Sequence, residues 1–443
     1  MAAAARPSRA AQAGAADHRQ PEGEAAAFEV GSRVLVDASW DDKQKYLAEV
    51  VDRRRAADGS SSYYVHYHDM DKRMDEWRHE LDLVPYQGAA LADVATPRAA
   101  LLPTMSGASL TSELITRNMK KKYNEIYHVP TDITDLAPID QTLEKEHHER
   151  TKVKNIQVIE LGRYEVDTWY YSPYPEPYNG LDRLFLCEFC LKYFGKRSTL
   201  LRHAAKCALR HPPGDEIYRS PPAGPGSVAP AIAMFEVDGN RSKIYCQCLC
   251  LMAKLFLDHK TLYYDVVDFL FYVLCEVDNE GYHIVGYFSK EKASQGGNNL
   301  ACILTLPPYQ RKGYGRFLIA FSYELTKKEG GFGTPERPLS DLGNVSYKSY
   351  WIRAILEVLH AGRGSMMSIQ DVSNVTGIHP ADVREAMGTL QLTQYVKGDT
   401  VLNVTPRIVE EHLQKMDNRL TILIDPARLH WTPYVASPTA GRR

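Results

Sequence analysis

The sequence predicts an α+β multidomain protein: a small β-barrel, followed by a mixed α/β core that a zinc finger and a C-terminal helix-turn-helix-like segment flank. The chain has 443 residues, which exceeds one ordinary domain and favours two or three folded units. Short β-prone runs near the N-terminus predict the barrel, and a succession of strands, glycine loop and helix predicts the core. Three cysteines and a histidine at metal-ligand spacing predict the finger.

The composition is that of a globular protein. Hydrophobic residues make up 44% and aromatic residues 10%, enough to fill real cores. The 53 basic and 55 acidic residues nearly cancel, so any contact with nucleic acid or membrane has to be local. No apolar run reaches the ~18 residues of a membrane span. The cysteine usage favours a reducing compartment over a secreted disulfide scaffold.

Residues 1–27 are rich in Ala, Gly and Arg and contain no Leu, Ile, Val or Phe. That excludes the apolar region of a secretory signal and predicts a disordered tail. An organelle transit peptide is the alternative, weakened by Asp17, Glu22 and Glu24.

Residues 28–85 are predicted to form the barrel. Val34–Val36 and Tyr63–Tyr67 are strand-like runs, and Ala56–Ser60 between them carries a turn signal. Trp77 and a short polar helix follow these strands.

Residues 86–150 have little periodicity and are predicted to be a linker. Lys120–Lys122 is its basic cluster. Solvated linker charge is the favoured interpretation, with a DNA-phosphate or nuclear-import contact as the alternative.

Residues 151–431 are dense in aromatic and apolar side chains and form the predicted core. Phe269–Val277 and Tyr282–Phe288 are strand-like, with a hairpin turn between them. A third strand is expected at Leu300–Leu306, followed by a glycine loop and an amphipathic helix over Tyr314–Glu329.

Two further segments fall inside this region. The Pro/Gly-rich stretch 220–230 predicts a surface loop. Ile369–Val401 predicts two short helices and a strand, with a turn at Thr376–Gly377, which is a helix-turn-helix-like pattern. A helix-turn-helix-like pattern more often contributes to packing within a domain than to DNA recognition.

Residues 185–210 contain the metal-ligand motif Cys-x2-Cys-x12-His-x3-Cys, formed by Cys187, Cys190, His203 and Cys207. Three thiolates and one imidazole make an accepted tetrahedral zinc set. His203 and Cys207 are expected on one face of a helix. Because all four positions are filled, the zinc is structural rather than catalytic, and a packing role is favoured over base reading.

Cys246, Cys248 and Cys250 raise the question of a second metal site. In a helix over Tyr245–Leu257, Cys248 does not share a face with the other two. Buried thiols in a core helix are therefore the favoured interpretation.

The loop Gln310–Gly315 lies between the third strand and its helix. Its two glycines allow the backbone to approach a ligand closely, and the amides of a helix N-terminus form an anion cradle suited to a pyrophosphate. Arg311 and Lys312 add positive charge. A plain turn is the alternative for such a loop by itself.

Several long segments closely resemble the MYST family of histone acetyltransferases. They are Trp169–Pro175, Phe256–Asp265, Ile284–Lys292, Ala301–Arg311 and Pro335–Gly343. The resemblance spans about residues 151–430. Residues 28–85, with Asp75-Glu76-Trp77, resemble the chromo-barrel (tudor-knot) domain of that family's nucleosome-acetylating branch.

This resemblance implies a CoA-dependent N-acetyltransferase core at residues 230–350, ahead of the helix-turn-helix-like part at 351–431. It implies that the pantetheine and thioester of acetyl-CoA lie along Ala301, Cys302, Ile303, Leu304 and Thr305. The pyrophosphate-binding residues it implies are Gln310, Arg311, Lys312, Gly313, Tyr314, Gly315 and Arg316. Further cofactor contacts would come from Ser340 and Ser349.

The chemistry requires a neutral lysine amine, whose ordinary pKa is about 10.4, to attack the thioester. The resemblance implies that Glu336 takes the proton, with burial raising its pKa towards the working range. Cys302 matches the family's active-site cysteine. It either carries the acetyl group as a covalent intermediate or, in the favoured interpretation, shapes the site for direct transfer. Lys260 matches the lysine that these enzymes acetylate on themselves, whereas an ordinary surface lysine is the alternative.

The resemblance implies a nuclear enzyme that acts on histone tails and nucleosomes, with a preference for the histone-four tail, inside a multisubunit acetyltransferase complex. RNA or methyl-lysine is the candidate ligand of the barrel, where Tyr46, Tyr67 and Trp77 are either an aromatic pocket or core. The main alternative is a catalytically silent chromatin adaptor. A small-molecule acetyltransferase and a zinc-finger transcription factor are less favoured.

Overall fold

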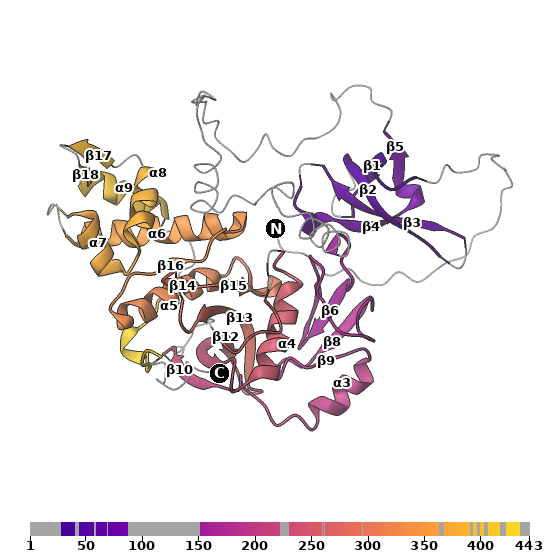
Figure 1. The fold of residues 1–443 in the computed structure, drawn as a ribbon, viewed down its shortest axis with the longest axis horizontal. Coiled ribbons are helices and arrows are strands. Elements are labelled where there is room, and N and C mark those ends of the chain that lie inside the picture. Colours follow the sequence, from indigo (N-terminus) through magenta and orange to yellow (C-terminus); the bar gives the residue numbers. More distant parts are fainter. Residues whose placement is uncertain are drawn as a thin grey trace, which may run out of the picture. The chain divides into compact units, whose positions relative to one another are not determined.

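A computed structural model describes the chain over residues 28–39, 44–56, 59–68, 70–86, 151–221, 230–258, 260, 262–294, 296–362, 367–389, 393–396, 399–402, 406–416 and 422–434. The predicted tail, the predicted linker with Lys120–Lys122 and most of the 220–230 loop lie outside these residues. Contacts divide the chain into two compact units, one drawn from residues 1–70 and 75–100 and the other from residues 71–74 and 101–443 (Figure 1).

The first unit contains a five-stranded antiparallel sheet in the order β4-β3-β2-β1-β5. The strands are β1 Arg33–Asp37, β2 Lys45–Arg55, β3 Ser61–Tyr67, β4 Glu76–His79 and β5 Leu83–Pro85, with the short helix η2 at Glu80–Asp82. The two predicted strands and the short polar helix are confirmed. Strand β2 was not predicted, although its buried Tyr46, Ala48 and Val50 alternate with less buried residues, which is a strand pattern.

Trp77 lies within β4, paired with Tyr64 of β3, so its predicted place after the strands was wrong. Strand β4 is short and polar apart from this residue, and its pattern alone carries no strand signal.

The second unit begins with a four-stranded sheet in the order β7-β6-β8-β9. Its elements are β6 Val158–Leu161, β7 Tyr164–Asp167, β8 Arg183–Leu186 and β9 Tyr193–Phe194, followed by helix α3, Arg197–Ala204. Parallel pairing of β6 with β8 aligns Ile159 with Leu184, and both are fully buried.

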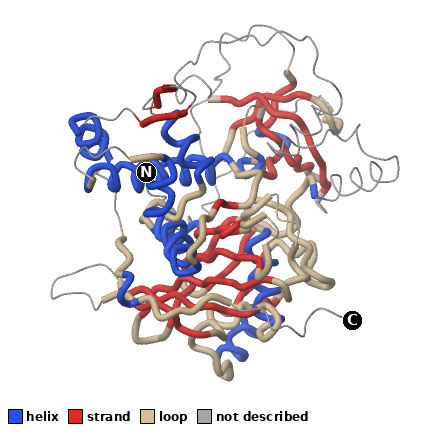
Figure 2. Tube along the Cα trace, turned by 60° about the vertical axis from the view of Figure 1, so that its left-hand side comes forward, coloured by secondary structure: helices blue, strands red, loops and turns tan. Residues whose placement is uncertain are grey.

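A second sheet, β10-β11-β12-β13-β15, forms the centre of this unit, and Figure 2 shows it as a layer of strands with helices packed next to it. The strands are β10 Asp215–Arg219, β11 Ala231–Asp238, β12 Phe269–Val277, β13 Tyr282–Glu291 and β15 Cys302–Thr305. The predicted hairpin of β12 and β13 is confirmed, with β13 running on to Glu291. Helix α4, Lys243–Lys254, is almost entirely buried beside the sheet.

The third predicted strand is divided at Ala301. Before it, β14 (Asn298–Leu300) pairs in parallel with the later β16 (Thr334–Pro335); after it, β15 pairs antiparallel with β13. The single strand expected over Leu300–Leu306 was therefore wrong. The strand is divided because β14 pairs with the distant β16, and no local sequence pattern predicts such a pairing.

Helix α5 covers Tyr314–Glu329 as predicted. Gly313 and Gly330, both with positive φ, begin and end it. Phe317, Leu318 and Phe321 on its inner side are fully buried, as expected for an amphipathic helix.

The C-terminal part contains α6 Asp341–Ala361, α7 Ile369–Thr376, α8 Pro380–Thr389, β17 Thr393–Val396, β18 Asp399–Leu402 and α9 Pro406–Met416. The two predicted short helices are confirmed, and the predicted strand is a hairpin. Trp351 of α6 is fully buried and donates a 2.8 Å hydrogen bond to Tyr323 of α5, which joins this part to the core. Among the described residues, no helix combines the length and apolarity that crossing a membrane requires.

Candidate active site and zinc centre

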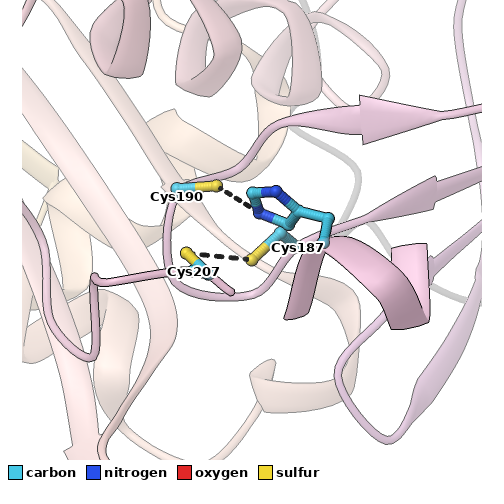
Figure 3. A group of neighbouring side chains, drawn as sticks. Cys187, Cys190 and Cys207 are labelled. Carbon is cyan, nitrogen blue, oxygen red and sulfur yellow. Dashed lines mark hydrogen bonds between the residues drawn. The ribbon is translucent and has the colours of Figure 1, made fainter. Parts of the chain in front are cut away.

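Four ligand-type side chains meet in the predicted finger. The Sγ atoms of Cys187, Cys190 and Cys207 and an imidazole nitrogen of His203 lie within 4.8 Å of one another. Cys187 Sγ lies 3.9 Å from Cys207 Sγ, and Cys190 Sγ lies 3.2 Å from His203 Nε2 (Figure 3). Two thiolates bound at ~2.3 Å on a tetrahedral zinc lie about 3.8 Å apart, so the spacing fits a zinc ion. Four protein ligands fill the tetrahedron, which makes the zinc structural.

Local structure brings these ligands together. Cys187 and Cys190 lie in the turn between β8 and β9, where Leu191 adopts a φ of 61° to reverse the chain. Helix α3 supplies His203 but ends at Ala204. The expectation that His203 and Cys207 share one helical face was therefore wrong: the chain turns back after the helix, and this return brings Cys207 to Cys187.

The finger packs on the central sheet. His283 of β13 lies between two carboxylates, with Nδ1 2.7 Å from Glu188 and Nε2 2.8 Å from Asp278. Phe189 packs against the His283 ring and beneath the guanidinium of Arg210. Both Glu188 and Phe189 lie between the first two zinc ligands, so the finger packs against β13 through residues of its own knuckle.

The predicted pyrophosphate loop has an unusual backbone. Arg311 has a φ of 63° and Gly313 a φ of 94°, so two residues lie in the left-handed region immediately before α5. The first amides of α5 have no acceptor within the helix and are available to an anion. Gln310 donates a 2.9 Å hydrogen bond to the carbonyl of Thr305, which ties the loop to the end of β15. The Arg311 and Lys312 side chains are exposed.

Cys302 opens strand β15 and is partly exposed. The Cys302 amide donates a 3.2 Å hydrogen bond to the Ser289 hydroxyl on the neighbouring strand β13. Lys260 Nζ lies 3.6 Å from Cys302 Sγ, and Lys260 is only 8% exposed, so it is not the surface lysine of the alternative interpretation. Burial by itself lowers the pKa of Lys260, but interactions with the thiols of Cys302 and Cys250 raise it overall.

The thiols of helix α4 are all buried, as predicted. Among the described residues, Cys246, Cys248 and Cys250 belong to no metal-ligand group. Burial raises the pKa of Cys248 and of Cys250 to about 11. The contact of Cys250 with Lys260 was not predicted, because the two residues lie on different segments.

Glu336 follows strand β16, and its amide donates a 2.8 Å hydrogen bond to the carbonyl of Leu300 at the end of β14. Leu300, Ala301 and Cys302 are consecutive, so Glu336 is attached beside the strand that carries Cys302. The Glu336 side chain is exposed. The expectation that the folded protein buries this carboxylate was therefore wrong, because it lies on the loop between β16 and α6 rather than under the sheet.

Ser340 is the N-cap of α6, and Ser349 lies within this helix. The Ser340 hydroxyl accepts a 3.1 Å hydrogen bond from the amide of Gly343 and caps this helix, a role that sequence analysis missed. Ser349 is partly buried.

The barrel aromatics divide into two groups. Tyr46 and Tyr67 are buried and pack edge to face at 6.1 Å, and the Tyr67 hydroxyl donates to Glu76 at 2.8 Å. Trp77 is partly exposed, and the Arg54 guanidinium lies 4.5 Å from the centre of its ring. The three therefore do not line one open aromatic pocket.

Comparison with known proteins covers most of the chain. The MOZ/SAS family matches residues 211–429, the MYST family zinc finger domain matches 153–207, and an "RNA binding activity-knot of a chromodomain" matches 28–83. A protein described as histone acetyltransferase of the MYST family 2, from Arabidopsis thaliana, is 49% identical over 412 residues, 92% of this chain and 86% of that protein.

Two further relatives extend the comparison. A putative MYST-like histone acetyltransferase 1 from Oryza sativa is 49% identical over 411 residues, 92% of this chain and 85% of that protein. Histone acetyltransferase MOF from Drosophila melanogaster is 41% identical over 415 residues, 85% of this chain and 49% of that protein.

The matched domains, together with the finger built around a structural zinc, define an acetyl-CoA-dependent lysine acetyltransferase. Its substrates are histones. The chain belongs to the MYST family of histone acetyltransferases.

Proposed function

We propose that Glu336 is the general base that removes a proton from the histone lysine during acetyl transfer. The observation that carries this proposal is the 2.8 Å hydrogen bond between the Glu336 amide and the Leu300 carbonyl, which attaches the glutamate beside Cys302. The lysine nitrogen attacks the thioester carbon, the C–N bond forms, and the C–S bond breaks. The amine proton passes to the Glu336 carboxylate, and the CoA thiolate leaves.

Because Glu336 is exposed, the bound substrates have to supply the desolvation that makes the carboxylate a stronger base. A lysine stem and a pantetheine arm are apolar enough to do so when they cover the loop. The Glu336 carboxylate is therefore desolvated only in the ternary complex of enzyme, acetyl-CoA and histone lysine.

We propose the following acetyl-CoA contacts. Ala301 to Thr305 line the pantetheine and thioester, and Gln310 to Arg316 bind the pyrophosphate at the N-terminus of α5. Ser349 adds a further contact from α6, and Ser340 adds one in addition to capping that helix. The left-handed backbone at Arg311 and Gly313 supports this assignment, because it turns successive amides toward one side of the loop.

The test is transfer of labelled acetyl from acetyl-CoA to nucleosomes and to free histones. Glu336→Gln is expected to abolish nearly all transfer, whereas Glu410→Gln, a change at an exposed glutamate on α9, leaves it intact. Equal activity of Glu336→Gln and the parent chain would refute the role of Glu336 as base.

Direct transfer is proposed over a covalent intermediate on Cys302. Cys302→Ser then retains transfer at a reduced rate, and no acetyl thioester accumulates on the parent chain under rapid quench. A chain mass increased by one acetyl group at Cys302 would establish the covalent route instead.

We further propose that the chain acts in the nucleus, prefers the histone-four tail on nucleosomes, and works within a multisubunit complex that regulates transcription. Family membership favours catalysis over the alternative of a silent adaptor. The domain bounds 28–85 and 151–431 are part of this proposal.

For the barrel we propose RNA rather than methyl-lysine as the ligand. Arg53, Arg54 and Arg55 are consecutive and exposed at the end of β2, where Arg53 and Arg55 share one face of the strand, and Arg54 covers the face of Trp77. Two exposed guanidinium groups on one strand face suit phosphates, while an aromatic cage for methyl-lysine needs open ring faces.

A further inference from the structure

The chain changes its pairing partner from β16 to β13 at Ala301, and Ser289 of β13 lies opposite this point. The Ser289 carbonyl accepts a 2.8 Å hydrogen bond from the Ala301 amide, and the Ser289 hydroxyl accepts a 3.2 Å hydrogen bond from the Cys302 amide. Two consecutive amides are therefore directed at a single residue of the neighbouring strand. This two-against-one arrangement defines a β-bulge.

The rest of the ladder shows that the bulge changes the phase of the chain. Strands β13 and β15 pair one to one, and just beyond β15 the Leu306 amide donates to the Val285 carbonyl at 2.9 Å. In a regular antiparallel pair only alternate residues direct their amides to a given neighbour, so Leu306 and Cys302 belong to one phase and Ala301 to the other. A shift by one residue moves a side chain to the opposite face of a sheet. The bulge therefore decides which face receives the Cys302 side chain.

The backbone around Cys302 is held from two directions. On the face that it occupies, Cys302 Sγ lies 3.6 Å from Lys260 Nζ. On one side of the bulge, the Leu300 carbonyl accepts a 2.8 Å hydrogen bond from the Glu336 amide, and on the other side Ser289 accepts the amides of the bulge itself. Ser289 is only 2% exposed, so water has little access to replace its hydroxyl as an acceptor.

We propose that Ser289 is a positioning residue, whose hydroxyl fixes the bulge that directs Cys302 and the start of β15 towards the thioester of acetyl-CoA. The inference rests on the proposed placement of the thioester along Ala301–Thr305. A serine at this position offers two acceptors to two amides, whereas an alanine leaves only the carbonyl for both. Misplacing a reacting group by about 1 Å costs up to ~100-fold in rate, so relaxing the bulge lowers turnover.

The test compares full-length Ser289→Ala and Ser289→Thr with the parent chain in steady-state transfer to a histone-tail peptide. Ser289→Ala is expected to lower kcat about tenfold or more, with KM for acetyl-CoA within about twofold, because the glycine loop ahead of α5 is untouched. Ser289→Thr keeps the hydroxyl on a strand-forming side chain and is expected to retain kcat within about threefold. If Ser289→Thr melts like the parent chain and still loses as much kcat as Ser289→Ala, the inference is overturned.

Ser220→Ala is the matched control. The Ser220 hydroxyl also accepts a strand amide, that of Ile232 at 3.0 Å, but it does so beside β10 and β11, at the opposite edge of the same sheet. Ser220→Ala is expected to leave kcat within about twofold. An equal fall in kcat for Ser220→Ala and Ser289→Ala would overturn the inference, since a loss of sheet stability would then explain both.

Hydrogen–deuterium exchange separates this inference from the cofactor assignment on which it rests. In the free chain, the Cys302 amide is expected to exchange about tenfold faster in Ser289→Ala than in the parent, because it has lost an acceptor, and unchanged exchange would overturn the role of Ser289 in the bulge. In the parent chain, bound acetyl-CoA is expected to slow exchange over residues 301–305. No slowing there would mean that the cofactor assignment fails and the inference fails with it. Slowing in the parent, together with parental kcat in Ser289→Ala, would overturn the positioning role alone.

Discussion

Lys260 illustrates how a side chain's surroundings decide its chemistry. Its ammonium lies 3.6 Å from the Cys302 thiol, and the side chain is buried. An acetyl group reaching this amine has to come from a thioester that is already in the active site, because bulk reagents have little access to it. This supports the proposal that the enzyme acetylates Lys260 on itself.

We predict that incubation with acetyl-CoA acetylates Lys260 but not Lys254. Lys254 is also buried, but its Nζ donates to the carbonyls of Leu257 and Asp258, at 3.3 and 2.7 Å, away from Cys302. Peptide mass spectrometry measures both sites. Equal acetylation of the two lysines would indicate non-enzymatic reaction and contradict the proposal.

Gly313 lies in the proposed pyrophosphate loop and has a left-handed backbone. We predict that Gly313→Ala raises KM for acetyl-CoA about tenfold, because an alanine at a φ of 94° is strained by ~1–2 kcal/mol and the loop distorts to relieve it. Gly331→Ala, at an exposed glycine with open space around its Cα, is the control and is expected to keep the parental KM. Isothermal titration with CoA checks the loss of binding directly.

At the scale of elements, the zinc finger is a short segment with a small core of its own that packs on the larger central sheet. Cys187, Phe194 and Leu200 form its own small buried cluster, which is too little to fold alone. Zinc closes this cluster, and Glu188 and Phe189 join it to β13 through His283.

We predict that the parent chain contains one zinc ion in its finger and that Cys190→Ser loses it, lowering the melting temperature by roughly 5 °C or more. Cys248→Ser, a change at a buried thiol outside the finger, keeps the zinc. Atomic emission and calorimetry measure the two quantities. Retention of full zinc by Cys190→Ser would show that the four side chains are not the ligand set.

At the scale of the whole molecule, the proposed acetyl transfer and the proposed RNA contact are assigned to different units. The second unit contains Cys302, Lys260 and Glu336 on its own segments. The first unit has no part in the proposed transfer, and its exposed arginines suit a phosphate backbone.

We predict that the double variant Arg53→Gln with Arg55→Gln weakens binding of single-stranded RNA. The slope of log K against the logarithm of the salt concentration is expected to become shallower by about 1.4, or ~0.7 for each lost phosphate contact. Lys45→Gln, which removes a lysine already paired with Asp37 at 2.7 Å, is the control. Acetylation of free histone peptides stays unchanged in both. Unchanged RNA affinity after loss of both arginines would refute the barrel proposal.

Much of the architecture follows from local sequence. The β12–β13 hairpin, helix α5 and the two short helices α7 and α8 were all predicted, because each has an apolar period and turn residues of its own. The division of β14 from β15 was not predicted. Strand β14 pairs with β16, a partner far along the chain, and no local pattern encodes such a pairing.

By itself, the sequence determined the zinc ligand set, the family motifs and the glycine loop ahead of α5, because spacing and residue type specify ligands and close backbone turns over a few residues. Only the tertiary structure decided the exposure of Glu336, the burial of Lys260 against Cys302, and the contact of Arg337 with Asp382. These features join segments far apart in the chain. Burial and charge pairing depend on which segments meet in space, and packing of the whole domain decides that.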